Sequence, residues 1–245
     1  MKKLGIAICL SSALLASAAQ AWEGNWLLGA STGYSAREGK NYITVIDGTS
    51  GRQSNVTFRE YDNNWTVGVL GGYQLSCNRW VMGLEANVDW REDDNHPFAF
   101  TDTSNVGWQG FAKYERDWIV GLTARLGYEI APYLMPYIRV GGEWHRDEIN
   151  LNISRPLGGL QAVLNGKRDV FRVVGGIGIE MPMAAIPVLS SVSFLSHLAV
   201  RLEYDYHSTG RSVGATGTTN DGVTLVSSSM NPHEQSGILA LVWNF

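Results

Sequence analysis

Charged side chains recur at every second position in several stretches of this chain, a spacing that places them on one face of a β-strand. They are Glu85, Asp89, Asp117, Arg125, Arg139, Glu143, Arg172, Glu180, Arg201, Glu203 and Asp205. Because buried charges must be paired to offset their desolvation, these four cations and seven anions predict a network of arginine–carboxylate ion pairs. A gated path for ions through the same groups is the alternative, and a catalytic pair of carboxylates would give a similar set.

Other groups that could perform chemistry are few. His207, Ser208 and Thr209 are adjacent and could supply the base and nucleophile of a lipid-modifying enzyme, although a strand that runs into a polar loop explains them as well. The remaining histidines show no metal-ligand spacing and are His96, His145, His197 and His233. Cys77 is the only cysteine after residue 21 and has no internal disulfide partner. We therefore expect no catalytic residues, no metal and no cofactor.

The elements that must position these charges are eight segments in which polar and apolar residues alternate strictly. Each segment has about ten residues, and alternation with period two over that length indicates a strand. The segments are 26–34, 64–73, 80–90, 117–128, 137–144, 171–180, 198–206 and 239–245.

The composition of the polar and apolar faces indicates which one points into the barrel and which one points outward. Lysine occurs only at positions 2, 3, 40, 113 and 167, and none of these lies on the polar face of a segment. A soluble lipid-binding barrel would carry lysines on a solvated outer face, so the polar faces here point into a narrow interior. The apolar faces carry no charge and hold seven of the nine tryptophans near strand ends, as in the aromatic girdles of transmembrane barrels. These are Trp26, Trp65, Trp80, Trp90, Trp118, Trp144 and Trp243.

The connections between segments alternate in length, which is typical of an up-and-down transmembrane barrel with short periplasmic turns and long outer loops. Short turns are expected at 76–79 and 129–134, and long loops at 36–61, 91–113, 145–168 and 207–234. The uncharged stretch 181–200 is predicted to be an apolar periplasmic turn that leads into the next strand. A spanning helix is the alternative there, but Pro182 and Pro187 disfavour it.

The first 21 residues are predicted to be a cleaved signal peptide. Lys2 and Lys3 precede an apolar run to about Ala18, and Ala19-Gln20-Ala21 has the form of a signal-peptidase site. Export and the barrel pattern exclude an ordinary cytosolic enzyme. The net charge of -4 gives no basic surface for nucleic acid. Residues 22–245 are then one outer-membrane domain.

The segments together resemble the eight-stranded OmpA-type and opacity-type outer-membrane barrels of Gram-negative bacteria. The resemblance is carried by the first strand at 26–34, the run 136–142, Arg201-Leu202-Glu203-Tyr204 and the terminal Phe245. In such proteins a final aromatic residue with apolar residues at alternate positions before it is recognised by the barrel-assembly machinery. The matching residues here are Leu239, Leu241, Trp243 and Phe245. No peptidoglycan-binding domain is expected after Phe245, so cell-wall anchoring is not implied.

We therefore predict an all-β, eight-stranded antiparallel transmembrane barrel in the outer membrane. Its expected role is structural and interactive, without catalysis, and the arginine–carboxylate network plugs its interior. The resemblance implies that four outer loops contact a host receptor or matrix or vary antigenically, and loops that are only solvated are the alternative. It also implies that the barrel wall meets membrane lipid and lipopolysaccharide. A narrow ion-conducting pore and a lipid A-modifying enzyme are the alternative functions.

Overall fold

The computed structural model describes residues 23–91, 97–101, 107–186 and 194–245, and all statements below concern this part of the chain. The expected signal peptide and His96 lie outside these ranges, and so does the side chain of Asp117. Within them the chain forms strands joined by turns and by two short 3-10 segments. In chain order they are β1 (Glu23–Ile46), β2 (Gln53–Cys77), β3 (Trp80–Arg91), β4 (Phe98–Thr101), β5 (Gln109–Tyr128), β6 (Met135–Arg155), β7 (Leu160–Pro182), η1 (Met183–Ala185), η2 (Leu195–His197), β8 (Leu198–His207), β9 (Val213–Thr218) and β10 (Leu225–Asn244).

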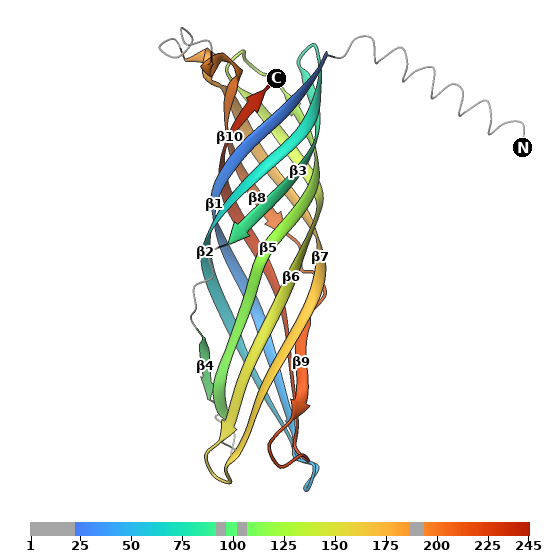
Figure 1. Ribbon diagram of the computed structural model, residues 1–245, viewed down its shortest axis with the longest axis vertical. Helices are drawn as coiled ribbons and strands as arrows, with labels where there is room; N and C mark the ends of the chain where they lie inside the picture. Colours follow the sequence, from blue (N-terminus) through green and yellow to red (C-terminus); the bar gives the residue numbers. More distant parts are fainter. Residues whose placement is uncertain (1–22, 92–96, 102–106, 187–193) are drawn as a thin grey trace, which may run out of the picture.

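Eight of these strands close into an antiparallel ring (Figure 1). The order around the ring is β1-β2-β3-β5-β6-β7-β8-β10, and β10 pairs back onto β1 with Leu28 opposite Trp243. Each of the eight predicted segments lies in one of these strands, and Phe245 follows directly after β10. The all-β prediction is confirmed, and the ring contains the predicted number of strands. We call the part in which all eight strands lie side by side the ring half.

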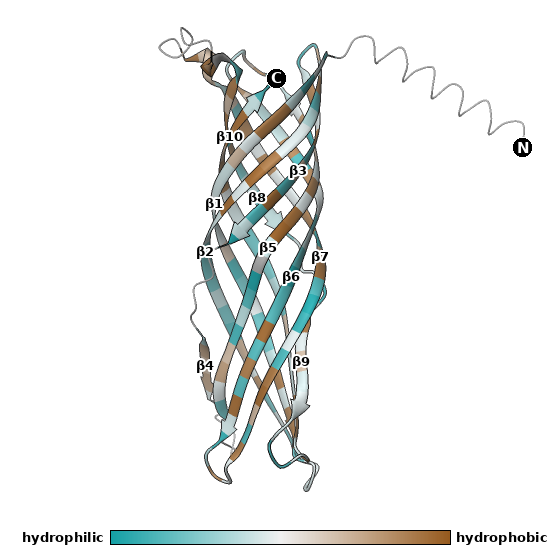
Figure 2. Ribbon diagram, in the orientation of Figure 1, coloured by the Kyte–Doolittle hydropathy of each residue, from teal (hydrophilic) through white to brown (hydrophobic). Residues whose placement is uncertain are grey.

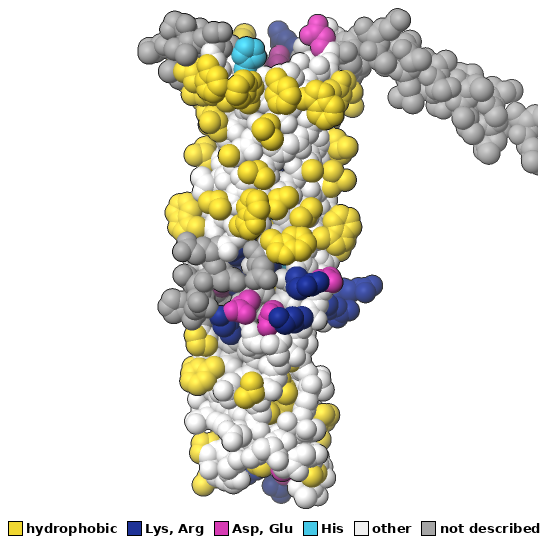
Figure 3. All heavy atoms as spheres, in the orientation of Figure 1, with side chains coloured by type: hydrophobic (Ala, Val, Ile, Leu, Met, Phe, Trp, Pro, Cys, Tyr) yellow, Lys and Arg dark blue, Asp and Glu magenta, His cyan; other side chains and the backbone are white. Residues whose placement is uncertain are grey.

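The strands of the ring half alternate between hydrophobic and hydrophilic residues (Figure 2), and hydrophobic side chains are spread over its visible outer face (Figure 3). Its ionic side chains are buried inside. Trp65 and Leu122 are about half exposed on the outside, whereas Arg125 is 3% exposed and Arg201 is 0% exposed. The period of two explains this separation, because successive side chains of a strand point to opposite faces of the sheet. The wall of the ring half is therefore suited to an apolar surrounding.

The structure replaces much of the predicted long loops with paired strands. β1 and β2 stay paired from Glu23 opposite Ser76 to Ile46 opposite Gln53, so only the turn 47–52 joins them. β6 and β7 likewise stay paired to Arg155 opposite Leu160. The region expected to be loop is mostly sheet, because the alternation continues past Tyr34 with the opposite polarity. Ile43 and Val45 point inward, whereas the predicted segment 26–34 requires apolar residues on the outer face. That criterion therefore ends β1 at Tyr34, although the strand continues to Ile46.

The opened part beyond β3 and β8, which we call the projecting half, consists of two four-stranded sheets. β3 ends at Arg91 and β8 at His207, and beyond these points pairing continues within β9-β10-β1-β2 and within β4-β5-β6-β7. Buried apolar residues from both sheets form one core between them: Ile43, Val45, Val56, Phe100, Trp108, Ala112, Tyr114, Ile149, Leu151, Ile153, Ala162, Leu164, Val213, Ala215, Val226 and Met230. The projecting half therefore has apolar side chains in its interior, as in a water-soluble pair of packed sheets, which is the reverse of the ring half.

The opposite end of the ring carries both ends of the described chain and the short turns (Figure 1). The backbone of Trp26 exchanges two 2.9 Å hydrogen bonds with Phe245, which completes the seam between β1 and the end of the chain. Asn78 takes a positive φ of 55° in the turn between β2 and β3, a conformation that asparagine tolerates. In the apolar connection, Phe194 packs edge-on against Trp243 with ring centroids 4.8 Å apart. None of the helices described is long and apolar enough to cross a membrane.

Candidate functional site: the charged interior and the projecting end

The centre of the ring half holds a cluster of two arginines and two glutamates from four different strands. Arg125 of β5 pairs with Glu180 of β7 and lies 3.1 Å from Glu85 of β3. Arg201 of β8 lies 2.7 Å from Glu180 and 3.0 Å from Glu85. Gln74 accepts a 2.7 Å hydrogen bond from Arg125. Each carboxylate therefore meets both guanidinium groups, and the charges of the cluster cancel.

A second cluster of predicted charges lies beside the first. Arg139 of β6 pairs with Glu203 and lies 3.3 Å from Asp205, both on β8. The Tyr137 hydroxyl donates to the same glutamate. Gly176 faces Asp205 closely enough that any Cβ at this position would collide with the carboxylate, so glycine makes room for the charge. Together the two clusters hold seven of the predicted charges: Glu85, Arg125, Arg139, Glu180, Arg201, Glu203 and Asp205.

The remaining predicted charges have other partners. Asp89 accepts a hydrogen bond from Asn87, and Arg172 lies 3.6 Å from Asp147. Glu143 contacts His207 instead of an arginine. The side chain of Asp117 lies outside the described part of the structure.

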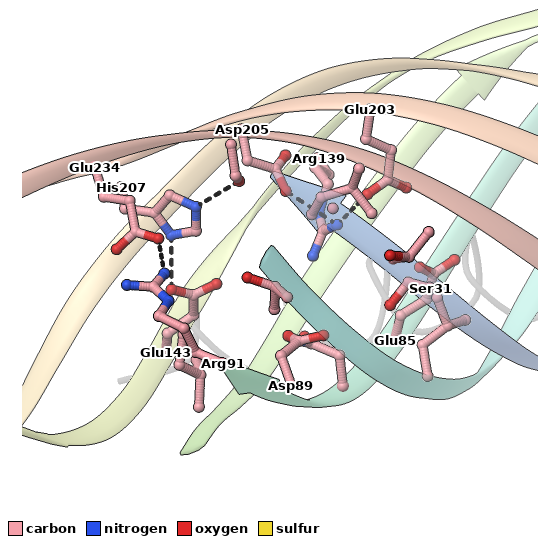
Figure 4. Close-up of a pocket in the computed structure, with 18 residues that line it drawn as sticks. Ser31, Glu85, Asp89, Arg91, Arg139, Glu143, Glu203, Asp205, His207 and Glu234 are labelled. Carbon is pink, nitrogen blue, oxygen red and sulfur yellow. Dashed lines mark hydrogen bonds and ion pairs between the residues drawn. The ribbon is translucent and has the colours of Figure 1, made fainter. Parts of the chain in front are cut away.

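Glu143, His207 and Ser236 form a chain of contacts with the order of a hydrolase triad. Figure 4 shows Glu143 and His207 side by side in the charged interior. His207 Nδ1 lies 2.8 Å from Glu143, and Nε2 lies 3.0 Å from the Ser236 hydroxyl. The adjoining cavity has a volume of about 40 Å³, which is room for about three water molecules and not for an acyl chain. Ser208 instead interacts with the backbone N–H of Val173, so His207 and Ser208 do not form the base–nucleophile pair considered from the sequence. Within the described residues, no group of His, Cys, Asp or Glu side chains is arranged to hold a metal.

A third charged cluster, absent from the sequence prediction, lies where the ring half meets the projecting half. Arg116 lies 2.8 Å from Asp147 and 2.7 Å from Glu234, and Arg91 also pairs with Glu234. Arg37 pairs with Asp62 in the same region. These side chains lie on inward positions of strands that extend beyond the predicted segments. Extending the period of two past Tyr34, Trp90 and Trp144 places Arg37, Arg91 and Asp147 inward. It does not do so for Arg116, which reaches the interior through the irregularity of β5 between Arg116 and Ile119.

The tryptophans predicted to form the girdle all lie on the outside of the ring half, between about 40% and 60% exposed. They form two rows with neighbouring aromatic residues. Near the chain ends, Trp26 contacts Tyr73 and Trp80 contacts Tyr128. Near the projecting half the contacts join Tyr34 to Trp65 and Trp144 to Phe171.

The spacing of the two rows fits a membrane. On β5 the rows are ten residues apart, from Trp118 to Tyr128. At about 3.3 Å per residue and a tilt of about 40°, this corresponds to about 25 Å, the height of the apolar band of outer-membrane barrels. The residues of the expected assembly signal also lie outward: Leu239, Leu241, Trp243 and Phe245.

The far end of the projecting half has a cavity of about 290 Å³ between the hairpin tips. Trp108 and Leu160 contribute apolar walls, and Arg52 and Arg155 contribute guanidinium groups. Asp47 belongs to the turn at its rim. The Thr49 hydroxyl and the N–H groups of Ser50 and Thr49 donate to this carboxylate, which lowers its pKa to about 2 and keeps it ionised. The tip is thus both concave and charged.

Comparison with known proteins finds a matching family model and several related sequences. The model of the outer membrane protein beta-barrel domain matches residues 6–230. Outer membrane protein A of Salmonella typhi is 28% identical over 227 residues, which is 92% of this chain and 53% of that protein. Outer membrane protein A of Escherichia coli O157:H7 is 31% identical over 156 residues, 62% of this chain and 38% of that protein. The chain thus spans about half or less of the length of these curated relatives.

A solved structure also resembles the fold. The outer membrane protein OprG from Pseudomonas aeruginosa superposes with a TM-score of 0.51 at 12% sequence identity. The alignment covers 91% of this chain and 96% of that one. At this level of identity the likeness concerns the fold alone.

Proposed function

This chain belongs to the outer membrane protein beta-barrel domain family and resides in the outer membrane of a Gram-negative bacterium, and from this we propose that it is a non-enzymatic surface-interaction protein. In this proposal the ring half spans the membrane and the projecting half stands outside the cell. The interior ion pairs plug the barrel, and the hairpin tips present a binding surface to a host or matrix ligand.

The observation that carries the proposal is the buried apolar core of the projecting half. β1 continues twelve residues beyond Tyr34 to Ile46. At about 3.3 Å per residue and a tilt of about 40°, the strand would reach about 30 Å beyond the outer aromatic row. A core such as that around Ile149 and Leu151 stabilises this extension as folded sheet. Rigid scaffolds of this kind hold binding turns in fixed positions.

A narrow ion-conducting pore is the second candidate, because the interior is lined with charge. Two observations favour the plug instead. The arginines of the ring half are held by carboxylates on other strands, as Arg201 is by Glu85 of β3 and by Glu180 of the neighbouring β7. Beyond them, ions would have to cross the apolar core of the projecting half, where an unsolvated charge is very unfavourable.

The wall and the end of the chain suggest partners that match the membrane location. The apolar band between the aromatic rows suits lipid tails, and the outer row suits the headgroup level. The alternate apolar residues that end at Phe245 suit recognition by the barrel-assembly machinery, as the family resemblance implies.

The surface role can be tested with the tip cavity. The double variant R52A/R155A should weaken binding of the refolded full chain to host cells or matrix at least tenfold, because it removes both guanidinium groups of the cavity. The matched control is Arg79→Ala, which removes a cation from the exposed turn at the opposite end.

A second variant tests for binding that depends on the tip but not on its two arginines. Hairpins shortened to the level of the outer aromatic row should abolish binding, provided that the ring half keeps its β-sheet circular dichroism. If the shortened barrel bound cells or matrix as strongly as the intact chain, the proposed surface role would be wrong.

A further inference from the structure

A pocket of about 350 Å³ opens in the wall of the projecting half, where β2 faces β4 (Figure 1). β4 pairs with β5, and within the described residues no strand pairing joins β4 to β2. We call this opening the seam pocket. Among the described residues it shares no lining side chain with the cavity between the hairpin tips. It is therefore a second concave site of the projecting half, and its volume lies at the lower end of the range for ligand pockets.

Glu60 is the buried polar group of the seam pocket. The residue is 3% exposed, and its Oε2 atom has no hydrogen-bond partner in the described chain. Arg37 attracts this carboxyl, but the guanidinium is paired with Asp62. An ionised carboxylate that is buried without a partner is very unfavourable. The pocket is therefore suited to a ligand that brings a positive charge to Glu60.

The neighbouring charges set the charge of such a ligand. Asp62 accepts from Arg37 and also accepts a 2.8 Å hydrogen bond from the Asn64 amide. Because the pair of Arg37 and Asp62 has no net charge, an ionised Glu60 leaves one negative charge at the pocket. A monovalent cation neutralises it. A metal ion fits less well, since no group of His, Cys, Asp or Glu side chains among the described residues is arranged to hold one.

Aromatic rings supply most of the remaining wall. Tyr34, Tyr61, Phe98 and Tyr114 all line the pocket. The Tyr114 ring is already engaged by Arg37, whose Cζ lies 4.2 Å from the ring centroid. Tyr34, Tyr61 and Phe98 are left to contact a ligand. Several rings around one carboxylate are the surroundings in which proteins hold quaternary ammonium groups, because the ring faces attract a cation that has no N–H to donate.

We propose that the seam pocket binds a small organic monocation with a quaternary ammonium group, held between the aromatic rings and paired with Glu60. The ligand class goes beyond the surface role, because the pocket is separate from the hairpin tips. A primary ammonium would need several acceptors for its three N–H groups, whereas a quaternary group needs only the rings and one countercharge.

The experiment is calorimetric titration of choline chloride into the refolded full chain at pH 8. The detergent is octyl glucoside, because detergents with a choline headgroup would compete for the site. Choline should bind, and Glu60→Gln should weaken its binding by about tenfold, since the countercharge is lost. Phe98→Leu should weaken it by about threefold, since one ring is lost. Glu148→Gln is the matched control, because it removes a carboxylate that is paired with Lys167 on the outer surface.

Two further ligands separate charge from shape. The neutral analogue 3,3-dimethylbutan-1-ol has the shape of choline without its charge and should bind about tenfold more weakly. Ethanolamine, with a primary ammonium, should also bind more weakly than choline. Equal binding of the neutral analogue, or unchanged affinity of a folded Glu60→Gln variant, would overturn the proposal. Tighter binding of ethanolamine would overturn the assignment to a quaternary group.

The pH dependence of binding gives a readout that a loss of packing would not change. Burial raises the pKa of Glu60 to about 7, and the ionised form that the cation requires becomes more populated between pH 6 and pH 8. The other charged or titratable groups around it are Arg37 of β1, Asp62 of β2 and the phenols that line the pocket. Choline should therefore bind about tenfold more tightly at pH 8 than at pH 6, and Glu60→Gln should remove this difference. Equal affinity of the parent chain at both pH values would count against an ion pair with Glu60. Host or matrix binding by Glu60→Gln should match that of the parent chain, so the tip is tested separately.

Discussion

At the scale of single residues, the interior of the ring half depends on arginines that each meet two carboxylates. Burial makes such a charge costly unless every partner is present, so the clusters behave as units. Glu180 illustrates this, because it accepts from both Arg125 and Arg201. Removing one member leaves the others with an uncompensated charge, which defines the first prediction.

Arg201→Met should destabilise the refolded barrel by about 3–5 kcal/mol, since it leaves Glu85 and Glu180 sharing a single arginine. The measurement is the urea midpoint of unfolding in detergent micelles. Arg201→Met combined with Glu180→Gln should recover part of the loss, because it restores the charge balance. Equal instability of the single and double variants would show that the cluster does not act through charge.

Glu60 provides a pH-dependent prediction at the same scale. This inward carboxyl of the projecting half is 3% exposed, and burial raises its pKa from 4.5 to about 7, while Arg37 opposes the shift and Asp62 adds to it. The folded chain keeps this proton between pH 4.5 and 7 while the unfolded chain has lost it. Stability should therefore fall as the pH rises through this window, by on the order of 2 kcal/mol.

The Glu60 prediction is measured by denaturant unfolding at pH 4.5, 6 and 8. Glu60→Gln should remove this part of the pH dependence, whereas Glu38→Gln, on the outer surface of the neighbouring strand, should retain it. An unchanged slope in Glu60→Gln would assign the pH dependence to other groups.

At the scale of elements, alternation identified each of the eight ring strands but not their full length. The segment 26–34 is only the membrane-facing part of β1, which continues to Ile46. Past Tyr34 the outer face of β1 is no longer consistently apolar, while the inner face stays polar through Arg37 and Asn41 and becomes apolar at Ile43 and Val45. The face that is apolar therefore switches, while the period of two does not.

The same switch explains which interior charges could be predicted. Glu85 and Arg201 stand in segments with an uninterrupted apolar outer face, so their inward position follows from the sequence alone. Arg37, Asp62 and Glu234 lie past the switch, among polar neighbours typical of loops. Which cation meets which carboxylate depends on distances across the ring, and a strand pattern carries no such information.

An element-scale prediction follows from the two-sheet construction of the projecting half. Leu151→Ala should remove about 2–5 kcal/mol from the local stability of this half, because Leu151 is 1% exposed within its core. Since no strand pairing joins the two sheets in the described residues of this half, we expect the loss to appear as faster protease cleavage beyond Arg91 and His207. Val140→Ala, on the outer wall of the ring half, is the control. Fragmentation of the ring half itself in Leu151→Ala would contradict the separation of the two halves.

At the scale of the whole molecule, the charged clusters and the apolar core lie one after another along the axis of the barrel. Planar-bilayer recordings of the refolded full chain should show no stable conductance steps, because an ion would have to break paired arginines and then cross the core. A porin refolded by the same protocol serves as the positive control. Reproducible unitary steps would favour the pore over the plug.

The unbroken course of β1, β2, β6 and β7 from the membrane turns to the far tips has a mechanical consequence. A pull on a bound tip would be directed along the strands, so it would load many backbone hydrogen bonds in shear at once instead of peeling them apart in sequence. The continuous strands would then transmit tension from a bound ligand at the tip directly to the ring half, without a flexible segment between the two.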